Sequence, residues 1–112
     1  MIEPTVIEYL LDALGGVPVR GGVPADPPAT FVTVEKTGGR RVNRISASTL
    51  AIQSWAPSIA DAAALNDRVK AAMEGIVQLD SICSCELNTD YNFTDSTRNR
   101  CRYQAVFDVV HY

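Results

Sequence analysis

The sequence is poor in the residues that most often carry out chemistry. Its 112 residues include one histidine, one tryptophan and three cysteines. Nucleophilic catalysis needs a serine or cysteine beside a base, and the only histidine, His111, is the penultimate residue. We expect its imidazole to be partly exposed and without a special role. No nucleophile elbow or phosphate-binding loop is present. The sequence therefore predicts no enzyme, no catalytic residue and no cofactor.

Long apolar runs and a large excess of charge are also missing. The first fifteen residues carry three acidic side chains and no basic start, so they resemble neither a signal peptide nor a membrane span. The formal net charge of −3 gives no general attraction to nucleic acid, so any basic site must be local. The odd cysteine count favours reduced thiols in the cytoplasm. We expect a soluble, unexported chain with no membrane partner.

The cysteines and the histidine still have to be considered as zinc ligands. The candidates are Cys83, Cys85, Cys101 and His111. On one strand, ten residues at about 3.3 Å each would place Cys101 and His111 roughly 33 Å apart, whereas zinc ligands lie about 2 Å from the metal. We therefore expect no metal site, and the cysteines to pack as small hydrophobic residues.

The first half of the chain predicts a helix followed by strands. Apolar residues recur at helical spacing over residues 3–14, before a glycine pair that can end a helix. Residues 17–20 predict a short edge strand, because Pro18 cannot donate to a ladder. Strands are expected at residues 31–35 and 49–55, with a turn at Thr37-Gly38-Gly39. Between them, residues 40–48 fit either a hairpin arm or a partly ordered loop.

The second half predicts one well-capped helix and two strands. Ser58 is a good N-cap, Asp61 favours the first turn, and Gly75 ends the helix or frays it. Residues 82–87 predict a strand, residues 88–99 a polar loop, and residues 101–112 a long strand. One face of that last strand is apolar and predicted to pack on the helix. Trp55 is expected to be a core or corner residue.

The element order α-β-β-β-α-β-β predicts an α+β fold. Each amphipathic helix needs one apolar surface, so we expect a small antiparallel or mixed β-sheet with the helices packed mainly on one face. Residues 1–112 have room for a single domain. Such a small sheet leaves backbone edges uncovered, and oligomerisation is one common way to cover them.

Charged side chains gather in two segments. The concentrated basic patch consists of Lys36, Arg40, Arg41 and Arg44. It can contact a phosphate backbone or an acidic neighbour, or simply remain solvated. The polar loop contains Asp90 and Asp95 beside Arg98 and Arg100, and there local ion pairing or solvation is the default expectation.

Several segments together resemble the small tail terminator, or tail-completion, proteins of long-tailed bacteriophages. They are the N-terminal helix ending in Leu14-Gly15, the run PATFVTVEKTGG, the strand TLAIQSWAPS, the alanine-rich helix and the final run RCRYQAVFDVV. The resemblance covers nearly the whole chain, but it rests on pattern and not on a catalytic motif.

The resemblance implies a structural virion protein at the head-proximal end of the tail, assembled in the host cytoplasm. Such a subunit forms a ring, expected to be a homo-hexamer, that stops growth of the major tail tube protein and offers a surface to a head-completion or connector protein. Residues 36–44 and 88–100 are then candidates for subunit contacts, tube contacts or the lumen through which DNA passes.

Two arrangements of the arginines stay open. In a lumen, Arg40, Arg41 and Arg44 would touch DNA phosphate without sequence specificity. At a subunit seam they would pair with carboxylates such as Asp90 or Asp95. Charge reversal of Arg40 and Arg41 should abolish assembly only at a seam. The alternative functions are another phage neck protein, such as a head-closure or connector protein, and a small ligand-binding or enzyme domain.

Overall fold

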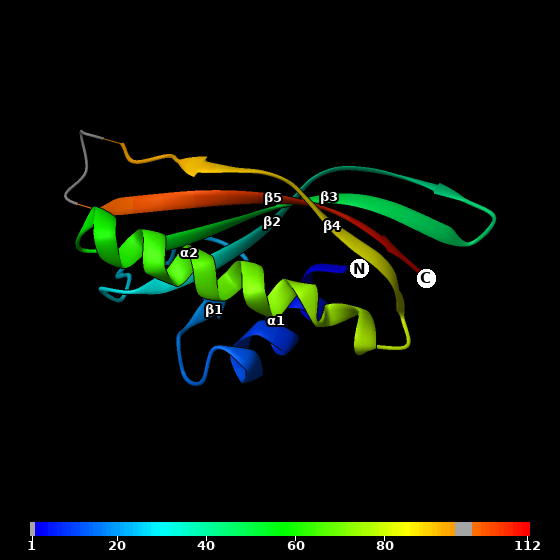
Figure 1. Ribbon diagram of the computed structural model, residues 1–112, viewed down its shortest axis with the longest axis horizontal. Coiled ribbons are helices and arrows are strands. Elements are labelled where there is room, and N and C mark those ends of the chain that lie inside the picture. Colours follow the sequence, from blue (N-terminus) through cyan, green and yellow to red (C-terminus); the bar gives the residue numbers. More distant parts are fainter. Residues whose placement is uncertain (1, 96–99) are drawn as a thin grey trace.

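The computed structural model describes residues 2–95 and 100–112 (Figure 1). In the described residues the elements are α1 (Ile2–Ala13), β1 (Val19–Arg20), β2 (Phe31–Val42), β3 (Ile45–Ala56), α2 (Ile59–Glu74), a 3₁₀ turn (Ile76–Gln78), β4 (Ile82–Asn92) and β5 (Cys101–His111). The predicted element order and the α+β class are confirmed. Neither helix is long and apolar enough to cross a membrane.

The five strands form one mixed sheet in the order β1-β2-β3-β5-β4. β1 pairs with β2 in parallel, and the other neighbours pair antiparallel. β1 lies at one edge, as its proline predicts, and β4 forms the other edge. Two residues of β1 cover only Val32 and Thr33 of β2, so most of that edge has no neighbouring strand.

Both helices pack against the same face of the sheet, as predicted (Figure 1). Alternate residues of the central strands point to this face, and they form one buried cluster with the apolar stripes of the helices. Its sheet members include Val32, Val34, Leu50, Ile52, Ala105, Phe107 and Val109, and its helix members include Val6, Leu10, Leu65, Val69 and Met73.

Side-chain hydrogen bonds fix the two helices relative to each other. The hydroxyl of Tyr9 in α1 donates to the carbonyl of Ala72 in α2 at 2.7 Å. Gly75 directly follows the last residue of α2. A Cβ on Gly75 would lie 2.9 Å from the Tyr9 hydroxyl, so a side chain there would disturb this contact. Nη2 of Arg68 donates to the carbonyl of Leu14, just beyond α1, at 2.7 Å. The exposed carbonyls at both helix ends thereby gain partners.

The predicted turn at Thr37-Gly38-Gly39 is wrong. β2 continues through it with a bulge between Lys36 and Gly38, and the ladder with β3 runs on to the pair Val42 and Ile45. Glycine is needed next to this bulge because the two strands approach closely there. A Cβ on Gly39 would lie 2.8 Å from the carbonyl oxygen of Ala47. The chain reverses instead at Asn43 and Arg44, whose φ values of 52° and 67° are left-handed. Of the two conformations left open for residues 40–48, the hairpin arm is observed.

The polar loop predicted for residues 88–99 begins later than expected. β4 extends to Asn92, and its residues from Thr89 to Asn92 pair with β5. An edge strand that is exposed over much of its length does not need alternating apolar residues, so its sequence looks like a loop. Backbone pairing with the apolar strand β5 decides its conformation.

We predict that Ser58→Ala destabilises the protein through the N-terminus of α2. The Ser58 hydroxyl accepts a hydrogen bond from the Asp61 amide at 3.1 Å, and loss of such a cap costs about 1 kcal/mol. Urea unfolding followed by circular dichroism measures the change. Ser81→Ala, at an exposed position outside the helices, is the control. Equal stabilities of the two variants would contradict the capping role.

Candidate assembly surfaces

The hairpin of β2 and β3 carries its basic residues on the segment 36–45, which we call the basic arm, and the tip at residues 42–45 projects beyond the paired end of β5 (Figure 1). β5 pairs with β3 only as far as Ser46, so the tip of the arm has no third strand beside it. Val42 is 60% exposed and Ile45 is 41% exposed, although both are apolar. A two-stranded ribbon with an uncovered apolar tip has the character of a docking element.

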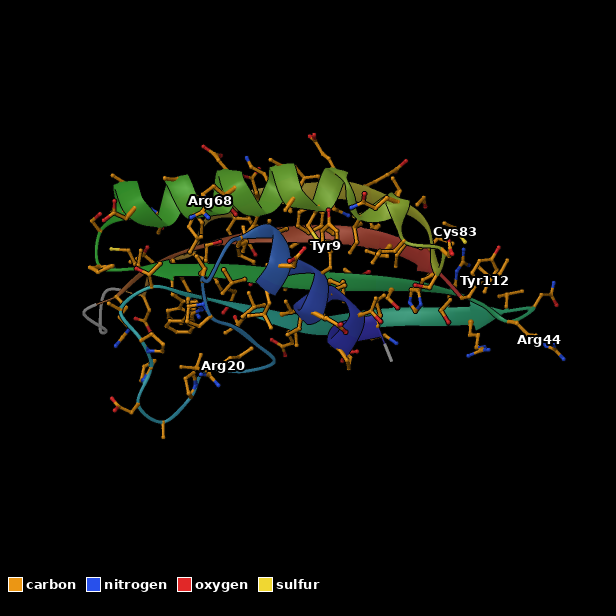
Figure 2. All side chains as sticks on the ribbon, turned by 90° about the horizontal axis from the view of Figure 1, so that it is seen from below. Tyr9, Arg20, Arg44, Arg68, Cys83 and Tyr112 are labelled. Carbon is orange, nitrogen blue, oxygen red and sulfur yellow. The ribbon has the colours of Figure 1, made fainter. Side chains whose placement is uncertain are left out.

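The basic arm carries all four predicted cations, Lys36, Arg40, Arg41 and Arg44, and all four residues are exposed. In the part of the chain that the structure describes, none of them forms an ion pair or a side-chain hydrogen bond. Figure 2 shows Arg44 at the far end of the molecule, away from both helices. The arm thus concentrates positive charge that the subunit does not neutralise.

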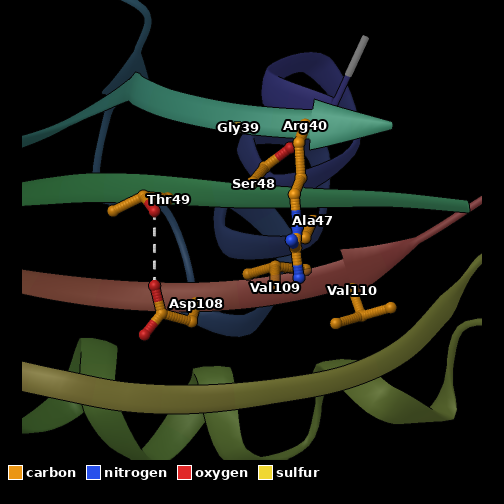
Figure 3. Close-up of a pocket in the computed structure, with 8 residues that line it drawn as sticks. All are labelled: Gly39, Arg40, Ala47, Ser48, Thr49, Asp108, Val109 and Val110. Carbon is orange, nitrogen blue, oxygen red and sulfur yellow. Dashed lines mark hydrogen bonds between the residues drawn. The ribbon is translucent and has the colours of Figure 1, made fainter. Parts of the chain in front are cut away.

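A shallow groove of about 360 Å³ lies at the base of the arm, on the face of the sheet opposite the helices (Figure 3). Arg40 extends from β2 across Ala47 of β3 toward Val109 and Val110 of β5. The Thr49 hydroxyl donates to Asp108 at 3.3 Å, and Asn88 donates to the same carboxylate at 3.0 Å. Asp108 is the acid among the lining residues, and within the described residues it forms no ion pair with Arg40.

Asp90, one of the predicted interface carboxylates, is already engaged inside the subunit. Its Oδ2 accepts hydrogen bonds from Lys70 Nζ and from Asn66 Nδ2, each at 2.9 Å. The bond from Lys70 holds the pKa of the Asp90 carboxyl below its ordinary value. Asp90 in turn raises the pKa of Lys70. Of the two expectations for this residue, local ion pairing is observed, with a lysine of α2 as its partner.

Arg100 is held by the loop that precedes β2. Its guanidinium donates to the carbonyls of Pro28 at 2.6 Å and Pro27 at 3.2 Å, and lies 5.9 Å from the centroid of the Phe31 ring. This side chain fastens a loop to the sheet, which is a role within the subunit. Asp95 precedes Arg100 in the same connection, and Arg98 lies outside the described residues.

Arg102 is the residue that sequence reasoning missed. Its guanidinium lies between two rings, 4.8 Å from the centroid of Trp55 and 4.3 Å from that of Phe93, and its Nε donates to the Phe93 carbonyl at 2.7 Å. Trp55 also stacks on Phe31, with centroids 5.3 Å apart. Trp55 is 2% exposed, so the prediction of a core position is confirmed. Trp55 and Arg102 lie opposite each other in the ladder of β3 and β5. A prediction of this register from the sequence would have identified the pair.

The candidate residues therefore fall into two separate groups. The basic arm lies at one end of a molecule that measures 44 Å along its longest axis, whereas Asp90, Arg100 and the connection after β4 lie toward the other end (Figure 1). The arginines of the arm therefore do not contact Asp90 within one subunit. Any pairing between them requires two copies of the chain.

The cysteines and His111 do not come together. Cys101 and His111 occupy opposite ends of β5, and the described residues contain no group of three potential metal ligands. Burial raises the pKa of the Cys85 thiol to about 11, with Asp108 and Glu86 adding to the effect, so the thiol is not a ready nucleophile. His111 is only 7% exposed, and its Nε2 lies 2.8 Å from the Ser48 hydroxyl. The predicted partial exposure of His111 is wrong, because this end of β5 lies between β3 and β4, where Ser48 bonds to the ring and Ile82 pairs with His111.

Comparison with known proteins supports the fold. No family model matches the chain, and no curated protein matches it. Among solved structures, the chain is similar to one described as "Virion of native gene transfer agent (GTA) particle". The match has a TM-score of 0.58 at 15% sequence identity, and covers 95% of this chain and 90% of the other. At this identity the likeness shows a shared fold.

We predict that Arg102→Ala exposes Trp55 and destabilises the protein by about 1 kcal/mol, because a partly buried cation–ring contact is lost. Trp55 is the only tryptophan, so its fluorescence reports this site alone. Emission should shift to longer wavelength, with a smaller shift for Arg102→Lys, which keeps the charge but not the planar group. Arg20→Ala, at an exposed position on β1, is the control. Unchanged emission in Arg102→Ala would contradict the contact.

We also predict a pH-dependent contribution from the pair of Lys70 and Asp90. The pKa of Asp90 is lowered from 3.8 in the folded protein, so its stabilisation is present above that value and is lost as the pH falls through the folded pKa. Urea unfolding should show Lys70→Met less stable than wild type at neutral pH, with the difference shrinking below about pH 4. Lys36→Met changes the only other lysine. Its difference in stability from wild type should not shrink at low pH. A difference that stays constant with pH would exclude the ion pair as its source.

Proposed function

We propose that this chain is a tail terminator of a long-tailed bacteriophage, with residues 1–112 acting as one tail-terminator-like domain. In this role a ring of identical subunits sits on the head-proximal end of the tail tube, stops its growth and forms the surface that joins the head. The major tail tube protein and a head-completion or connector protein are the expected partners. The role is structural and requires no catalytic group or cofactor.

The observation that carries the proposal is the fold shared with a chain of a virion over almost the whole length of both chains. The pattern resemblance of the sequence to tail terminators leads to the same class of particle independently of that match. Two features of the subunit agree with assembly: the basic arm with its apolar tip, and a sheet whose outer edges at β2 and β4 lack neighbouring strands. A ring contact can engage such arms and edges.

The partly buried charged groups support a scaffold more than a reaction centre. Three of these side chains form contacts that hold other segments in place. Asp90 binds α2, Arg100 binds the loop before β2, and Arg102 binds the carbonyl of Phe93 just after β4. The open groove beside Arg40 presents one carboxylate, which is already hydrogen bonded, among aliphatic side chains. We therefore propose no activity for this groove.

The test is to disrupt the gene in its phage and to score tail length and head attachment together by electron microscopy. We expect tubes of uncontrolled length beside DNA-filled heads, because tube growth continues until a terminator binds. Restoration of normal length by the wild-type gene supplied in trans is the control. Normal-length free tails beside leaking heads would assign the protein to head closure instead. Morphologically normal particles would overturn a neck role altogether and favour a binding or enzyme domain.

A further inference from the structure

The basic arm has two properties that together define its partner. Val42 and Ile45 pair across the ladder and are exposed, so the tip offers a small apolar contact. Arg41 and Arg44 directly precede Val42 and Ile45 in the chain, and neither arginine forms an ion pair in the described part of the chain. A surface that fits the arm must therefore combine apolar side chains with unneutralised carboxylates.

Such a surface exists on the same chain. A groove of about 670 Å³ runs between α1 and the turn that precedes β4. Tyr9 and Leu79 contribute partly buried apolar surface, and Glu8, Asp12 and Asp80 contribute carboxylates. Thr5 and Ser81 complete the lining. None of these three acids forms an ion pair within the described residues.

The arm cannot fill the groove of its own subunit. It is a continuation of β2 and β3, locked by the ladder, and Figure 2 shows Arg44 projecting past the body while Tyr9 lies on α1. Contact between the two surfaces consequently requires a second copy. Because the surfaces are different, each copy can give one arm and receive another, which is the head-to-tail contact that closes rings.

We infer that the basic arm of one copy docks in the acidic groove of the next copy, with Val42 and Ile45 against Tyr9 and Leu79, and with Arg41 and Arg44 facing Asp12 and Asp80. The inference deepens the proposed function, because it rests on ring formation and names the seam. It replaces Asp90, which is already paired to Lys70, as the acidic partner of the arm.

The alternative occupant of the arm is DNA phosphate, which would attract the four cations equally well. Phosphate recognition, however, gives no reason for two exposed aliphatic residues at the tip, whereas a protein groove with Tyr9 and Leu79 does. The observations therefore favour a protein partner over a nucleic acid, and the experiment below separates the two.

Two charge-reversed variants test the seam. The arm variant is Arg41→Glu with Arg44→Glu, and the groove variant is Asp12→Lys with Asp80→Lys. Native mass spectrometry and sedimentation measure the assembly of each. We expect wild type to form rings and each variant alone to lose them, with self-association weakened about tenfold or more, because like charges now meet at every seam. Circular dichroism verifies that both variants fold.

Mixing the two variants is the decisive step. An acidic arm fits a basic groove and a basic arm fits an acidic groove, so an equal mixture should form rings that contain both variants alternately and in equal number. The matched control is Asp26→Lys with Glu74→Lys, which has the same total charge as the groove variant but changes exposed positions outside the groove. Mixed with the arm variant, this control should give rings of its own chain and no alternating rings.

Other outcomes would overturn either the inference or the proposed function. Rings formed by either variant alone would show that the arm and the groove do not meet. Intact rings combined with loss of binding to a duplex DNA probe in the arm variant would assign the arm to phosphate. Wild-type protein that stays monomeric, alone and on tail tubes, would remove both the seam and the proposed ring. Alternating rings together with normal tail length after gene disruption would uphold the seam and reject the terminator role.

Discussion

One-sided burial of the sheet is the constraint on which the rest of the structure depends. Two helices share one apolar face, and Tyr9 bonded to Ala72 sets their spacing. The described residues contain no third α-helix for the opposite face or for the edges. The arm at one end of the sheet and the outer side of β4 therefore remain in contact with solvent. The surfaces available for assembly follow from this shortage of covering elements.

At the end of the sheet away from the arm, arginine side chains and not a helix cover the opposite face. Arg102 lies between Trp55 and Phe93, while Arg100 fastens the loop before β2 over Phe31. A guanidinium suits this position because its flat faces contact rings while its edges donate hydrogen bonds to carbonyls. Arg100 and Arg102 are thus held in place by aromatic rings and backbone oxygens. Within the described residues, the arginines on the arm have no such ring or carbonyl contacts. This difference separates arginines that hold the fold together from arginines that can bind a partner.

The sequence predicted the fold where patterns are local. The helix that begins after Ser58, the apolar face of β5 and the edge position of β1 all follow from periodicity, capping and a proline. It failed where pairing across the sheet decides the conformation. The glycines after Lys36 indicate a turn when taken alone, and only the ladder with β3 converts them into a bulge within a strand. Likewise, β4 looks like a loop because its long exposed stretch lacks an apolar period.

The same limit applies to the candidate surfaces. Sequence reasoning found the cations of the arm because they are close together in the chain. It left open contact with DNA phosphate or pairing across a seam with carboxylates such as Asp90 or Asp95, and Asp90 is bound to Lys70. Glu8 and Asp12 are four residues apart and share one face of α1, but Asp80 joins them only through the packing of α1 beside the turn that precedes β4. No spacing in the sequence reveals that third acid. Exposed ion pairs stabilise little by themselves. An apolar tip that excludes water from its flanking charges strengthens them, which is why Val42 and Ile45 matter as much as the arginines beside them.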